Sequence, residues 1–445
     1  MIGSTWSIDG REVRGGTTQV LGFKHSLVSV VAATVSSRSR LVIDNAPDIL
    51  ETTVLAALLR DRGVRVARTG STLELDSTTV VGGNLDSSLS SQIHGAHYLV
   101  PALLGAGENL RFANTGGCAI GDGPQRKRPV GHMLEVLRRH GASFDPEPGG
   151  WTLGRSGHWT AANHDIFDYS ESPEVLTGPH ISGATKTALI AGLGGNDGPT
   201  RVVHPYPKPD VTDLIRLAEL KGGLIEASPS QVTLRPPQRI SAEHTHHIYL
   251  TPDLSEVMTF MVLGLMLNVE LTVVAAQMEL VRQGLAAECQ LLEQMGVDLH
   301  WTSSTVHASA PACLRAIDIE VTSVGIYSDH QPLFALLFTR ADGPGRIRER
   351  VWTNRFDYVD ELRAFGVSTE RGTGEATIWP GSLQIPSGVV RATDLRMAAV
   401  LVIAGLACGG PAVVAGIDHL ERGYSRLSER LASLGARVDI SATLT

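Results

Sequence analysis

The sequence has few cysteines and no excess of positive charge, and both features narrow the possible functions. Its four cysteines, Cys118, Cys289, Cys313 and Cys408, form no closely spaced pair, which excludes a disulfide framework and a cysteine-based zinc site as its organising element. Such cysteine use fits a reducing, cytoplasmic environment. The net charge is −8, whereas domains that bind nucleic acid are generally basic, so no nucleic acid polymer is expected as a partner.

The chain also lacks the hydrophobic segments that membranes require. Its longest apolar stretch, near residues 397–408, is shorter than the ~20 residues that span a bilayer, and it therefore predicts a buried helix. Residues 1–6 show no basic stretch followed by an apolar core, so no signal peptide is expected. These absences together predict a cytoplasmic protein without a membrane partner.

The chain does have enough length and apolar material for more than one core. Its 445 residues exceed what one hydrophobic core usually organises. Hydrophobic residues make up 42% and charged residues 19%, which is typical of globular proteins. We therefore expect two globular domains.

One pattern recurs six times along the chain: an amphipathic helix, then a glycine, then a short strand-like run. In segment 58–66, for example, Gly63 separates the helical part from the strand-like part. A glycine at this point suits the left-handed conformation that often ends a helix. The glycines of the pattern, roughly 70 to 80 residues apart, are Gly63, Gly141, Gly222, Gly296, Gly366 and Gly435.

Six other segments are apolar on most faces, which is typical of buried helices. We interpret the two patterns as six α/β modules, three per domain, with the buried helices inside and the ligand site in a cleft between the domains. A generic two-domain α/β protein is the alternative. The apolar segments lie near residues 26–35, 96–104, 184–193, 257–267, 332–338 and 397–407. Each precedes a strand-like run, at 40–44, 109–112, 200–203, 270–274, 345–348 and 411–414.

Segment 115–130 contains the residues best suited to chemistry. It has four glycines, Cys118 and three consecutive cations, Arg126, Lys127 and Arg128. Cations close to a thiol favour the reactive thiolate. The N-terminus of the helix expected to begin near Val130 also favours anions. A flexible loop with solvated charges and an inert cysteine is the alternative interpretation.

Other charged residues recur at the junctions between modules. Each of them, taken alone, is more often a surface or helix-capping residue. Together, several cations and one carboxylate suit an anionic substrate and a general base. These residues are Lys24, Asp329, His330, Arg355, Asp394, Arg396 and Arg422.

Three histidines, His244, His246 and His247, are close enough in sequence to be considered as metal ligands. We interpret them as part of a solvated loop, because no carboxylate or cysteine lies at the usual ligand spacing. No metal site is therefore expected.

Several segments, taken in combination and in order, resemble the UDP-N-acetylglucosamine enolpyruvyl transferases, whose wider family includes enolpyruvylshikimate phosphate synthase. The resemblance covers nearly the whole chain and implies a two-domain inside-out α/β barrel of six βαβαββ-type repeats, three per domain. It implies a C-terminal-type domain of residues 1–23 and 251–445, a catalytic-loop domain of residues 24–250, and an active site in the cleft between them. The matching positions are 22–26, 116–121, 128–130, 181–185, Asp329, 354–356, 391–396 and 421–424.

The resemblance implies that the enolpyruvyl group of phosphoenolpyruvate is transferred to a hydroxyl through a tetrahedral phospho-ketal, without a metal or organic cofactor. Cys118 would donate a proton to the enol carbon or add to it, and fosfomycin would alkylate this cysteine. Asp329 would take the proton from the acceptor hydroxyl, and Arg355 would support the closed cleft. The phosphate and carboxylate of phosphoenolpyruvate would be bound by Lys24, which also counts as a catalytic residue, and by Arg128, Arg396 and Arg422.

The chain departs from this family where the acceptor would bind. His25 replaces the usual asparagine, and His94 aligns with an expected arginine. Gly131 takes the place of an aspartate near the uracil, and Leu254 that of an arginine. These differences suggest that the handling of phosphoenolpyruvate is kept while the sugar and uridine contacts are rebuilt. The candidate acceptor-binding residues are His25, His94, Arg126, Lys127, Pro129, Val130, Ser182, Gly183 and Arg355.

A specialised relative fits these departures. The chain is similar to the enolpyruvyl transferases of the nikkomycin and polyoxin nucleoside-antibiotic pathways, which modify the 3′-hydroxyl of UMP, and the cations Arg126 and Lys127 would suit a terminal nucleotide phosphate. One alternative is a UDP-N-acetylglucosamine 1-carboxyvinyltransferase of peptidoglycan synthesis. Another is a non-catalytic nucleotide-binding paralogue, against which the joint presence of Lys24, Cys118, Asp329 and Arg422 speaks.

Overall fold

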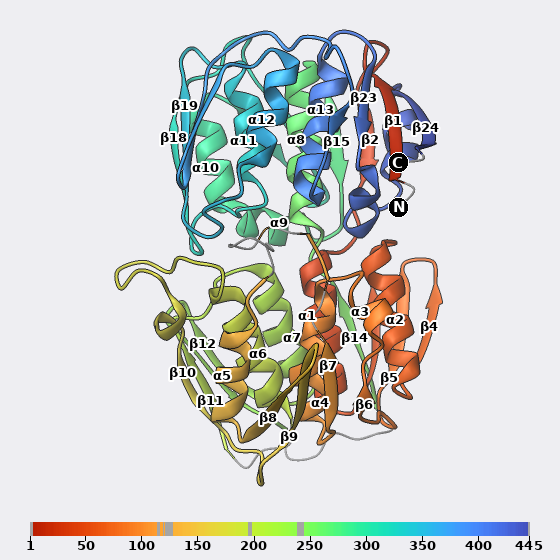
Figure 1. Ribbon diagram of the computed structural model, residues 1–445, viewed down its shortest axis with the longest axis vertical. Coiled ribbons are helices and arrows are strands. Elements are labelled where there is room, and N and C mark those ends of the chain that lie inside the picture. Colours follow the sequence, from red (N-terminus) through yellow and green to blue (C-terminus); the bar gives the residue numbers. More distant parts are fainter. Residues whose placement is uncertain are drawn as a thin grey trace. The chain divides into compact units, whose positions relative to one another are not determined.

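The computed structural model describes residues 3–113, 116–118, 120, 128–194, 198–237 and 244–443. The chain divides into two compact units, each built from segments that are separate in the sequence (Figure 1). Unit 1 consists of Met1–Leu21, Cys118–Arg128 and Pro252–Thr445, and unit 2 of Gly22–Gly117 and Pro129–Thr251.

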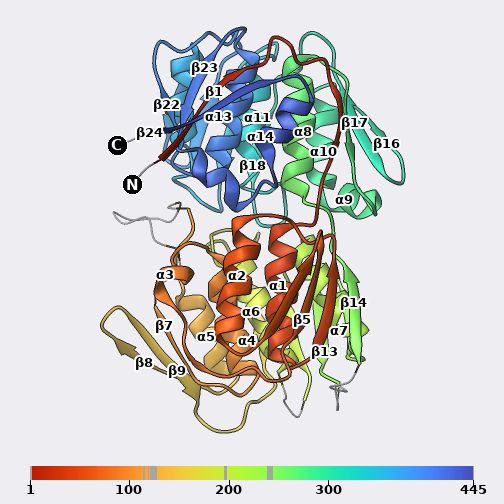
Figure 2. The same cartoon turned by 90° about the vertical axis from the view of Figure 1, so that its right-hand side faces the viewer.

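Three helices form the centre of each unit. In unit 2, helices α1 (Lys24–Ser36), α4 (Leu99–Gly105) and α6 (Ile181–Leu193) contact one another, as Figure 2 shows, and nearly all of their side chains are buried. In unit 1, helices α8 (Leu254–Leu267), α11 (Gln331–Phe338) and α13 (Leu395–Ala407) do the same. These are the six apolar segments identified in the sequence, so the prediction of buried helices is confirmed.

Six four-stranded sheets surround these helices, three in each unit, and all have the same mixed pattern of one parallel pairing and two antiparallel pairings. In unit 2 the strand orders are β14 (Thr245–Tyr249), β3 (Arg40–Asp44), β5 (Thr72–Asp76), β4 (Arg65–Thr69); β6 (Gly83–Asn84), β7 (Leu110–Ala113), β9 (Gly150–Arg155), β8 (Ala142–Glu147); and β10 (Asn163–Asp165), β11 (Thr200–Val203), β13 (Gln231–Arg235), β12 (Leu224–Ser228). In unit 1 they are β2 (Gly16–Gln19), β15 (Leu271–Val274), β17 (Thr305–Ser309), β16 (Asp298–Trp301); β18 (Asp318–Val321), β19 (Gly345–Glu349), β21 (Glu375–Ile378), β20 (Thr369–Gly372); and β22 (Val390–Arg391), β23 (Ala412–Ala415), β1 (Gly3–Asp9), β24 (Arg437–Thr443).

Outer helices connect the strands and complete the six modules. The repeated glycines that follow them all have positive φ, between 77° and 98°, as expected for a left-handed helix stop. The inside-out α/β arrangement predicted from the sequence, with helices within and strands around them, is therefore confirmed for each unit. The outer helices are α2 (Leu50–Asp61), α5 (Gly131–Arg139), α7 (Pro209–Leu220), α10 (Ala286–Gln294), α12 (Asp357–Leu362) and α14 (Leu427–Ser433). Shorter helices are α3 (Ser87–Ser90), α9 (Met278–Gly284), η1 (Gly95–Tyr98), η2 (Ile166–Tyr169), η3 (Arg363–Phe365) and η4 (Ile417–Arg422).

Three of the strands pair with strands that are distant in the sequence. Strand β1 lies between β23 and β24, antiparallel to both, and β2 pairs in parallel with β15. Strand β14 pairs in parallel with β3, at the other end of its unit in sequence. Each unit is thus completed by a strand that is far away in the sequence from the strand that it contacts.

The interpretation of the histidine cluster as a solvated loop was wrong for two of its three residues. His246 and His247 lie on β14 and pair with β3, rather than in a solvated loop. The strand was missed because its short sequence, with two consecutive histidines and one buried residue, lacks hydrophobic alternation. Across the described ranges, no group of histidine, cysteine, aspartate or glutamate side chains could hold a metal ion.

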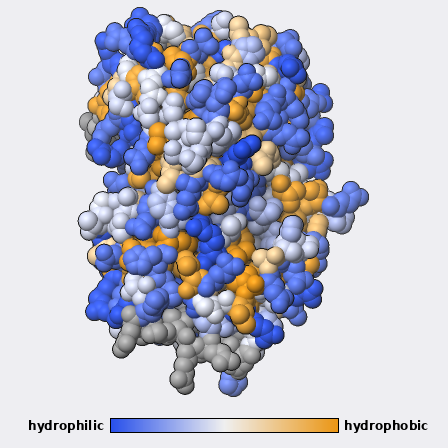
Figure 3. All heavy atoms as spheres, turned by 180° about the vertical axis from the view of Figure 1, so that it is seen from behind, coloured by the Kyte–Doolittle hydropathy of each residue, from blue (hydrophilic) through white to orange (hydrophobic). Residues whose placement is uncertain are grey.

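The described helices are all too short, or not apolar enough, to cross a membrane. On the face drawn in Figure 3, hydrophobic residues are interspersed with hydrophilic ones. The large hydrophobic side chains that are exposed include Leu224, Ile385 and Ile440, which lie on or near different strands.

Candidate active site

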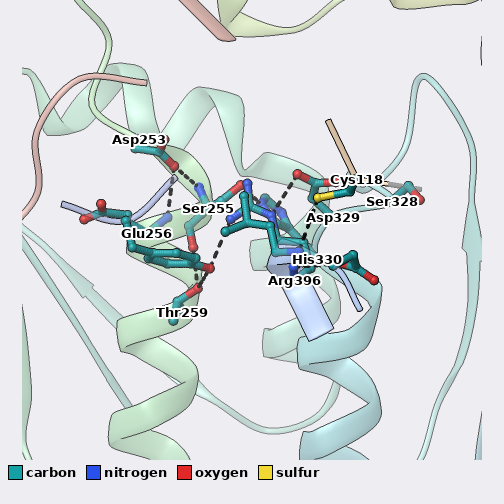
Figure 4. Close-up of polar contacts among 12 residues, drawn as sticks. Cys118, Asp253, Ser255, Glu256, Thr259, Ser328, Asp329, His330 and Arg396 are labelled. Atoms are coloured by element: carbon teal, nitrogen blue, oxygen red, sulfur yellow. Dashed lines mark hydrogen bonds and ion pairs between the residues drawn. The ribbon is translucent and has the colours of Figure 1, made fainter. Parts of the chain in front are cut away.

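The N-termini of the three inner helices of unit 1 lie close together. Ser255 in the first turn of α8 contacts His330, which precedes α11, and Arg396 in the first turn of α13 contacts Asp329 (Figure 4). Helix N-termini carry partial positive charge and favour anions. The repeated modules therefore bring three such ends to one place in this unit.

Asp329 is the carboxylate around which two buried arginines are arranged. Arg355 Nη1 donates to Asp329 Oδ1 at 2.5 Å, and Arg396 Nε donates to Asp329 Oδ2 at 2.8 Å. The arginine side chains are only 6% and 4% exposed, whereas that of Asp329 is 24% exposed. Asp329 is thus the member of the group that solvent or a substrate can reach.

Both arginines remain cationic in this setting. Burial, the largest single influence, would lower the pKa of each guanidinium, but the charge of Asp329, its hydrogen bonds and other nearby acidic groups together raise the pKa of Arg355 and Arg396 above its usual value. Arg396 Nη1 also donates to Tyr424 Oη at 3.0 Å, and this hydroxyl lies 2.8 Å from Thr259 Oγ1. Tyr424 and Thr259 therefore fix the direction of the Arg396 fork.

Cys118 lies at the start of the helix that carries Arg396. Its Sγ accepts a hydrogen bond from Leu395 N, in the first turn of α13, at 3.4 Å. Asp394 caps the same helix by accepting from the amides of Arg396 and Met397 at 2.8 and 3.2 Å. The half-buried thiol is therefore held at the first turn of α13 by the backbone amide of Leu395.

Two further arginines of the predicted set belong to unit 1. The guanidinium of Arg128 lies over the ring of Trp352, 5.5 Å from its centre, and Arg128 Nε is 3.5 Å from the carbonyl oxygen of Cys118. Arg422 ends η4 beside His419, whose pKa is lowered by burial and then by the nearby Arg422. In the part of the chain that the structure describes, Arg422 Nη1 is buried without a hydrogen-bond partner.

Unit 2 carries the predicted residues that lie at the start of α1 and around the loop. Lys24 is the first residue of α1, and the ring of the following His25 stacks edge-on against Phe23 at 5.1 Å. His94 packs against Gly117, where φ is 106° and an added Cβ would lie 2.8 Å from His94 Cβ. Gly117 is therefore required both by its conformation and by the close approach of His94.

Helix α5, which follows Pro129 and Val130, contacts α6, which carries Ser182 and Gly183, through a residue that the sequence did not single out. His132, in the first turn of α5, presses against Gly183, where a Cβ would lie 2.2 Å from His132 Nε2. Its ring stacks on His180 at 4.8 Å, and burial, followed by the charge of His180, lowers the pKa of His132 to about 3. The only sequence signal for this contact was that His132 follows Val130 closely and that His180 immediately precedes α6.

The structure thus gathers the predicted residues into two groups. Arg126 and Lys127 lie outside the described residues. Unit 1 holds Cys118, Arg128, Asp329, Arg355, Arg396 and Arg422, and unit 2 holds Lys24, His25, His94, Pro129, Val130, Ser182 and Gly183. The first group combines a thiol, a reachable carboxylate and buried cations, which suits proton transfer on an anionic substrate.

Comparison with known proteins identifies relatives over nearly the whole chain. The family EPSP synthase (3-phosphoshikimate 1-carboxyvinyltransferase) matches residues 14–431. The UDP-N-acetylglucosamine 1-carboxyvinyltransferase of Azorhizobium caulinodans is 28% identical over 440 residues, covering 95% of this chain and 96% of that protein. The UDP-N-acetylglucosamine 1-carboxyvinyltransferase 2 of Listeria monocytogenes is 28% identical over 444 residues, covering 98% and 97%.

Solved structures give the same result. The crystal structure of the enolpyruvyl transferase NikO from Streptomyces tendae superposes with a TM-score of 0.92 at 33% identity, covering 100% of both chains. The EPSP synthase of Acinetobacter baumannii superposes with a TM-score of 0.69 at 18% identity, covering 98% of this chain and 100% of that one, which shows a shared fold.

Proposed function

The chain belongs to the EPSP synthase family. We propose that it transfers the enolpyruvyl group of phosphoenolpyruvate to the 3′-hydroxyl of a uridine nucleotide, with UMP as the preferred acceptor. That the chain is an enolpyruvyl transferase follows from the family and from the full-length match to NikO. The acceptor, the hydroxyl and the roles of individual residues are the proposal.

The reaction has two steps. In the addition, the acceptor oxygen bonds to C2 of phosphoenolpyruvate and loses its proton, while the methylene carbon gains a proton, which gives the tetrahedral phospho-ketal. In the elimination, the new methyl group loses a proton, the bond from C2 to the phosphate oxygen breaks, and phosphate leaves. Such a sequence needs an acid at the methylene carbon, a base at the hydroxyl and cations at the phosphate.

Asp329 is proposed as the base, and the observation that carries this assignment is that its carboxylate is 24% exposed, whereas the side chains of its partners Arg355 and Arg396 are buried. A carboxylate that accepts hydrogen bonds from two guanidinium groups is a poor proton acceptor. We propose that the anionic groups of phosphoenolpyruvate compete for Arg396, which weakens its hold on Asp329. Binding of the first substrate would then make Asp329 more basic when the acceptor arrives.

Cys118 is proposed to act on the enolpyruvyl group, either as proton donor to the methylene carbon or as a nucleophile that adds covalently to C2. Its sulfur lies beside the first turn of α13, the helix that also presents Arg396. Arg128, Arg396 and Arg422 are proposed to bind the phosphate and carboxylate of phosphoenolpyruvate. Lys24, in unit 2, is proposed as a further anchor for these anions.

The choice of UMP rests on the rebuilt acceptor contacts. The family positions that would recognise the acceptor read His25, His94, Gly131 and Leu254 in this chain. A sugar nucleotide whose hydroxyls and acetamide lose their partners would bind weakly, at about 1 to 3 kcal/mol for each buried group left unpaired. The names of the curated relatives favour UDP-N-acetylglucosamine as the second candidate acceptor.

Product analysis tests the proposal. Phosphoenolpyruvate is incubated with the protein and with UMP, uridine or UDP-N-acetylglucosamine, and phosphate release and the mass of the nucleotide product are followed. We expect phosphate release that depends on UMP, together with an enolpyruvyl-UMP product. Phosphate release without a modified nucleotide, or no release with any uridine nucleotide, would refute the proposed acceptor class.

A further inference from the structure

We infer that two buried glutamates, Glu288 and Glu349, are positioning residues that hold Asp329 in place for proton transfer by fixing both sides of the turn on which it lies. This inference rests on the proposed role of Asp329 as the base. Neither glutamate belongs to the segments that carry the family resemblance, and both are almost completely buried.

Asp329 lies in an irregular turn rather than in a helix or strand. The turn is closed by a hydrogen bond from His330 N to Tyr327 O at 2.9 Å, and α11 begins only after it, at Gln331. A turn of this kind does not by itself fix the side chain of its third residue. The position of Asp329 therefore depends on what holds the neighbouring residues.

Glu288, on α10, holds both ends of the turn. Its Oε1 accepts a hydrogen bond from Tyr327 N at 2.8 Å and lies 2.8 Å from His330 Nδ1. One carboxylate oxygen thus links the residues that precede and follow the segment containing Asp329. The side chains of Glu288 and His330 are both 0% exposed, so water does not compete for these contacts.

His330 extends this connection to a second helix. Its Nε2 lies 3.0 Å from Ser255 Oγ at the start of α8 (Figure 4). Serine, histidine and glutamate are connected here in the order found in hydrolase triads. They do not form a nucleophilic site, because Ser255 is 2% exposed and the amides of Ser255 and Glu256, which could bind an oxyanion, already donate to Asp253 at 2.9 and 3.0 Å. The contacts of Ser255, His330 and Glu288 therefore connect α8 and α10 to the turn.

Glu349, at the end of β19, holds the middle of the turn. Its Oε2 accepts from Ser328 Oγ at 2.7 Å, and its Oε1 accepts from Val351 N and Trp352 N at 2.7 and 3.2 Å. Arg355 Nη1, which binds Asp329, also lies 3.3 Å from Ser328 Oγ. Asp329 is therefore flanked by residues held from two directions, by α10 and by the end of β19.

The position of Asp329 matters because the rate of proton transfer depends steeply on distance. A base must lie within hydrogen-bond reach of the proton it takes, and a misplacement of about 1 Å can lower the rate about a hundredfold. Burying a carboxylate is unfavourable unless its hydrogen bonds are satisfied. Glu288 and Glu349 accept hydrogen bonds from the backbone and side chains around Asp329. These hydrogen bonds therefore fix the geometry of the turn.

Two substitutions at one position separate a positioning role from a structural one. Glu288→Gln keeps an oxygen that can accept from Tyr327 N and His330, whereas Glu288→Leu removes it. We expect Glu288→Leu to lower kcat by about 10- to 100-fold with KM for phosphoenolpyruvate changed by less than about threefold, and Glu288→Gln to stay within about threefold of the parent in both. Cys289→Ala, the next residue on α10 and also buried, is the matched control, with a lower melting temperature and unchanged kcat.

The kinetic constants of all variants are measured at a temperature well below each melting point. A Glu288→Leu protein that is folded and has the kcat of the parent overturns the inference, and so does a Glu288→Gln protein as slow as Glu288→Leu. If Glu288→Leu does not fold, Ser328→Ala decides, since it removes the contact with Glu349 and leaves the core intact. An unchanged kcat for Ser328→Ala then overturns the inference, and a several-fold loss supports it.

Failure of the inference can be distinguished from failure of the proposed function. If Asp329→Asn retains full turnover, Asp329 is not the base and the proposed mechanism fails. If Asp329→Asn is nearly inactive while Glu288→Leu and Ser328→Ala are normal, the base assignment stands and only the positioning role is wrong.

Discussion

Asp329 pairs with two buried guanidinium groups and is also the proposed base, and one substitution tests both functions. Asp329→Asn keeps the shape of the side chain but removes its charge and its basicity. We expect kcat to fall by about 10²- to 10⁴-fold, as is usual for loss of a general base. We also expect roughly 3 kcal/mol less stability, because Arg355 and Arg396 lose their partner. Steady-state kinetics and chemical denaturation measure the two effects.

The control is another aspartate of unit 1 that pairs with arginines on the surface. Asp360 contacts Arg363 and Arg371, and its side chain is about half exposed. Asp360→Asn should leave kcat unchanged, since exposed ion pairs contribute little. Near-normal turnover of Asp329→Asn with reduced stability would show that Asp329 has a structural role alone.

Cys118 should be the thiol that fosfomycin modifies. Its sulfur is half-buried beside the first turn of α13, whereas burial raises the pKa of the Cys289 thiol to about 12 and also raises that of Cys408. We expect intact-protein and peptide mass spectrometry to show one adduct, on Cys118, and none on Cys118→Ser. An adduct confined to the exposed Cys313 would count against the assignment.

Lys221 gives a pH-dependent test of the core of unit 2. Burial lowers the pKa of this lysine to about 7, and its Nζ donates to Ser37 and Ser39 Oγ, each at 2.7 Å. The unfolded chain, with a lysine pKa near 10.5, binds more protons than the folded chain between pH 7 and pH 10.5, so the free energy of unfolding should rise with pH across this range. Charge on Lys221 is thus unfavourable for folding at pH 7 and below.

Lys221→Met removes this dependence. We expect the variant to be more stable than the parent at pH 7, by roughly 1 to 4 kcal/mol, and the difference to shrink toward pH 10. Urea denaturation at the two pH values measures it, and kcat should not change. A difference that is independent of pH would mean that Lys221 stays charged when folded.

At the scale of single residues, the sequence offered candidate site residues but not which of them touch. Asp329, Arg355 and Arg396 were each identified by their position at a module junction or by the resemblance. Their mutual contacts could not be predicted, because the three residues are far apart in sequence and meet only when helices pack. His132 and Glu288 were missed for the same reason, since neither lies in a recognisable motif and their roles follow from tertiary contacts.

At the scale of elements, the N-terminus of α13 connects local structure with the proposed chemistry. Asp394 caps this helix through the amides of Arg396 and Met397, and its Oδ1 also lies 4.0 Å from Arg355 Nη2. Asp394→Ala should lower stability by about 1 kcal/mol through loss of the cap. It should also lower kcat several-fold, because Arg396 lies in the turn that the cap fixes. Thermal unfolding and steady-state kinetics measure the two effects.

A second helix cap provides the matched control. Asp86 caps α3 in unit 2 in the same way, by accepting from the amides of Ser88 and Leu89. Asp86→Ala removes the same kind of cap from a helix that holds no proposed site residue, so kcat should not change. Equal kinetic effects of the two substitutions would show that the Asp394 cap has no special connection with the site.

The helices were more predictable than some strands. A helix that is apolar on all faces has a strong sequence signal, and all six inner helices were located correctly. Strand β14 contains the consecutive His246 and His247 and pairs with only one neighbour, and its sequence resembles a polar loop. The strength of the hydrophobic pattern explains both outcomes.

At the scale of the whole molecule, the repeat of helix, glycine and strand predicted six modules because every module needs the same left-handed stop. It did not predict how β1, β2 and β14 complete sheets whose other strands are far away in the sequence, since periodicity contains no information on distant pairing. The resemblance implied that the N-terminal strand joins the second half of the chain, and β1 indeed pairs with β23 and β24.

The preference of the protein for one acceptor over the other can be measured in a side-by-side comparison. The ratio kcat/KM is measured for UMP and for UDP-N-acetylglucosamine at saturating phosphoenolpyruvate. Loss of two or three buried sugar contacts, at about 1 to 3 kcal/mol each, predicts that UMP is favoured by at least about thirtyfold. A preference for UDP-N-acetylglucosamine of about tenfold or more would refute UMP as the preferred acceptor and would make the protein a divergent UDP-N-acetylglucosamine 1-carboxyvinyltransferase.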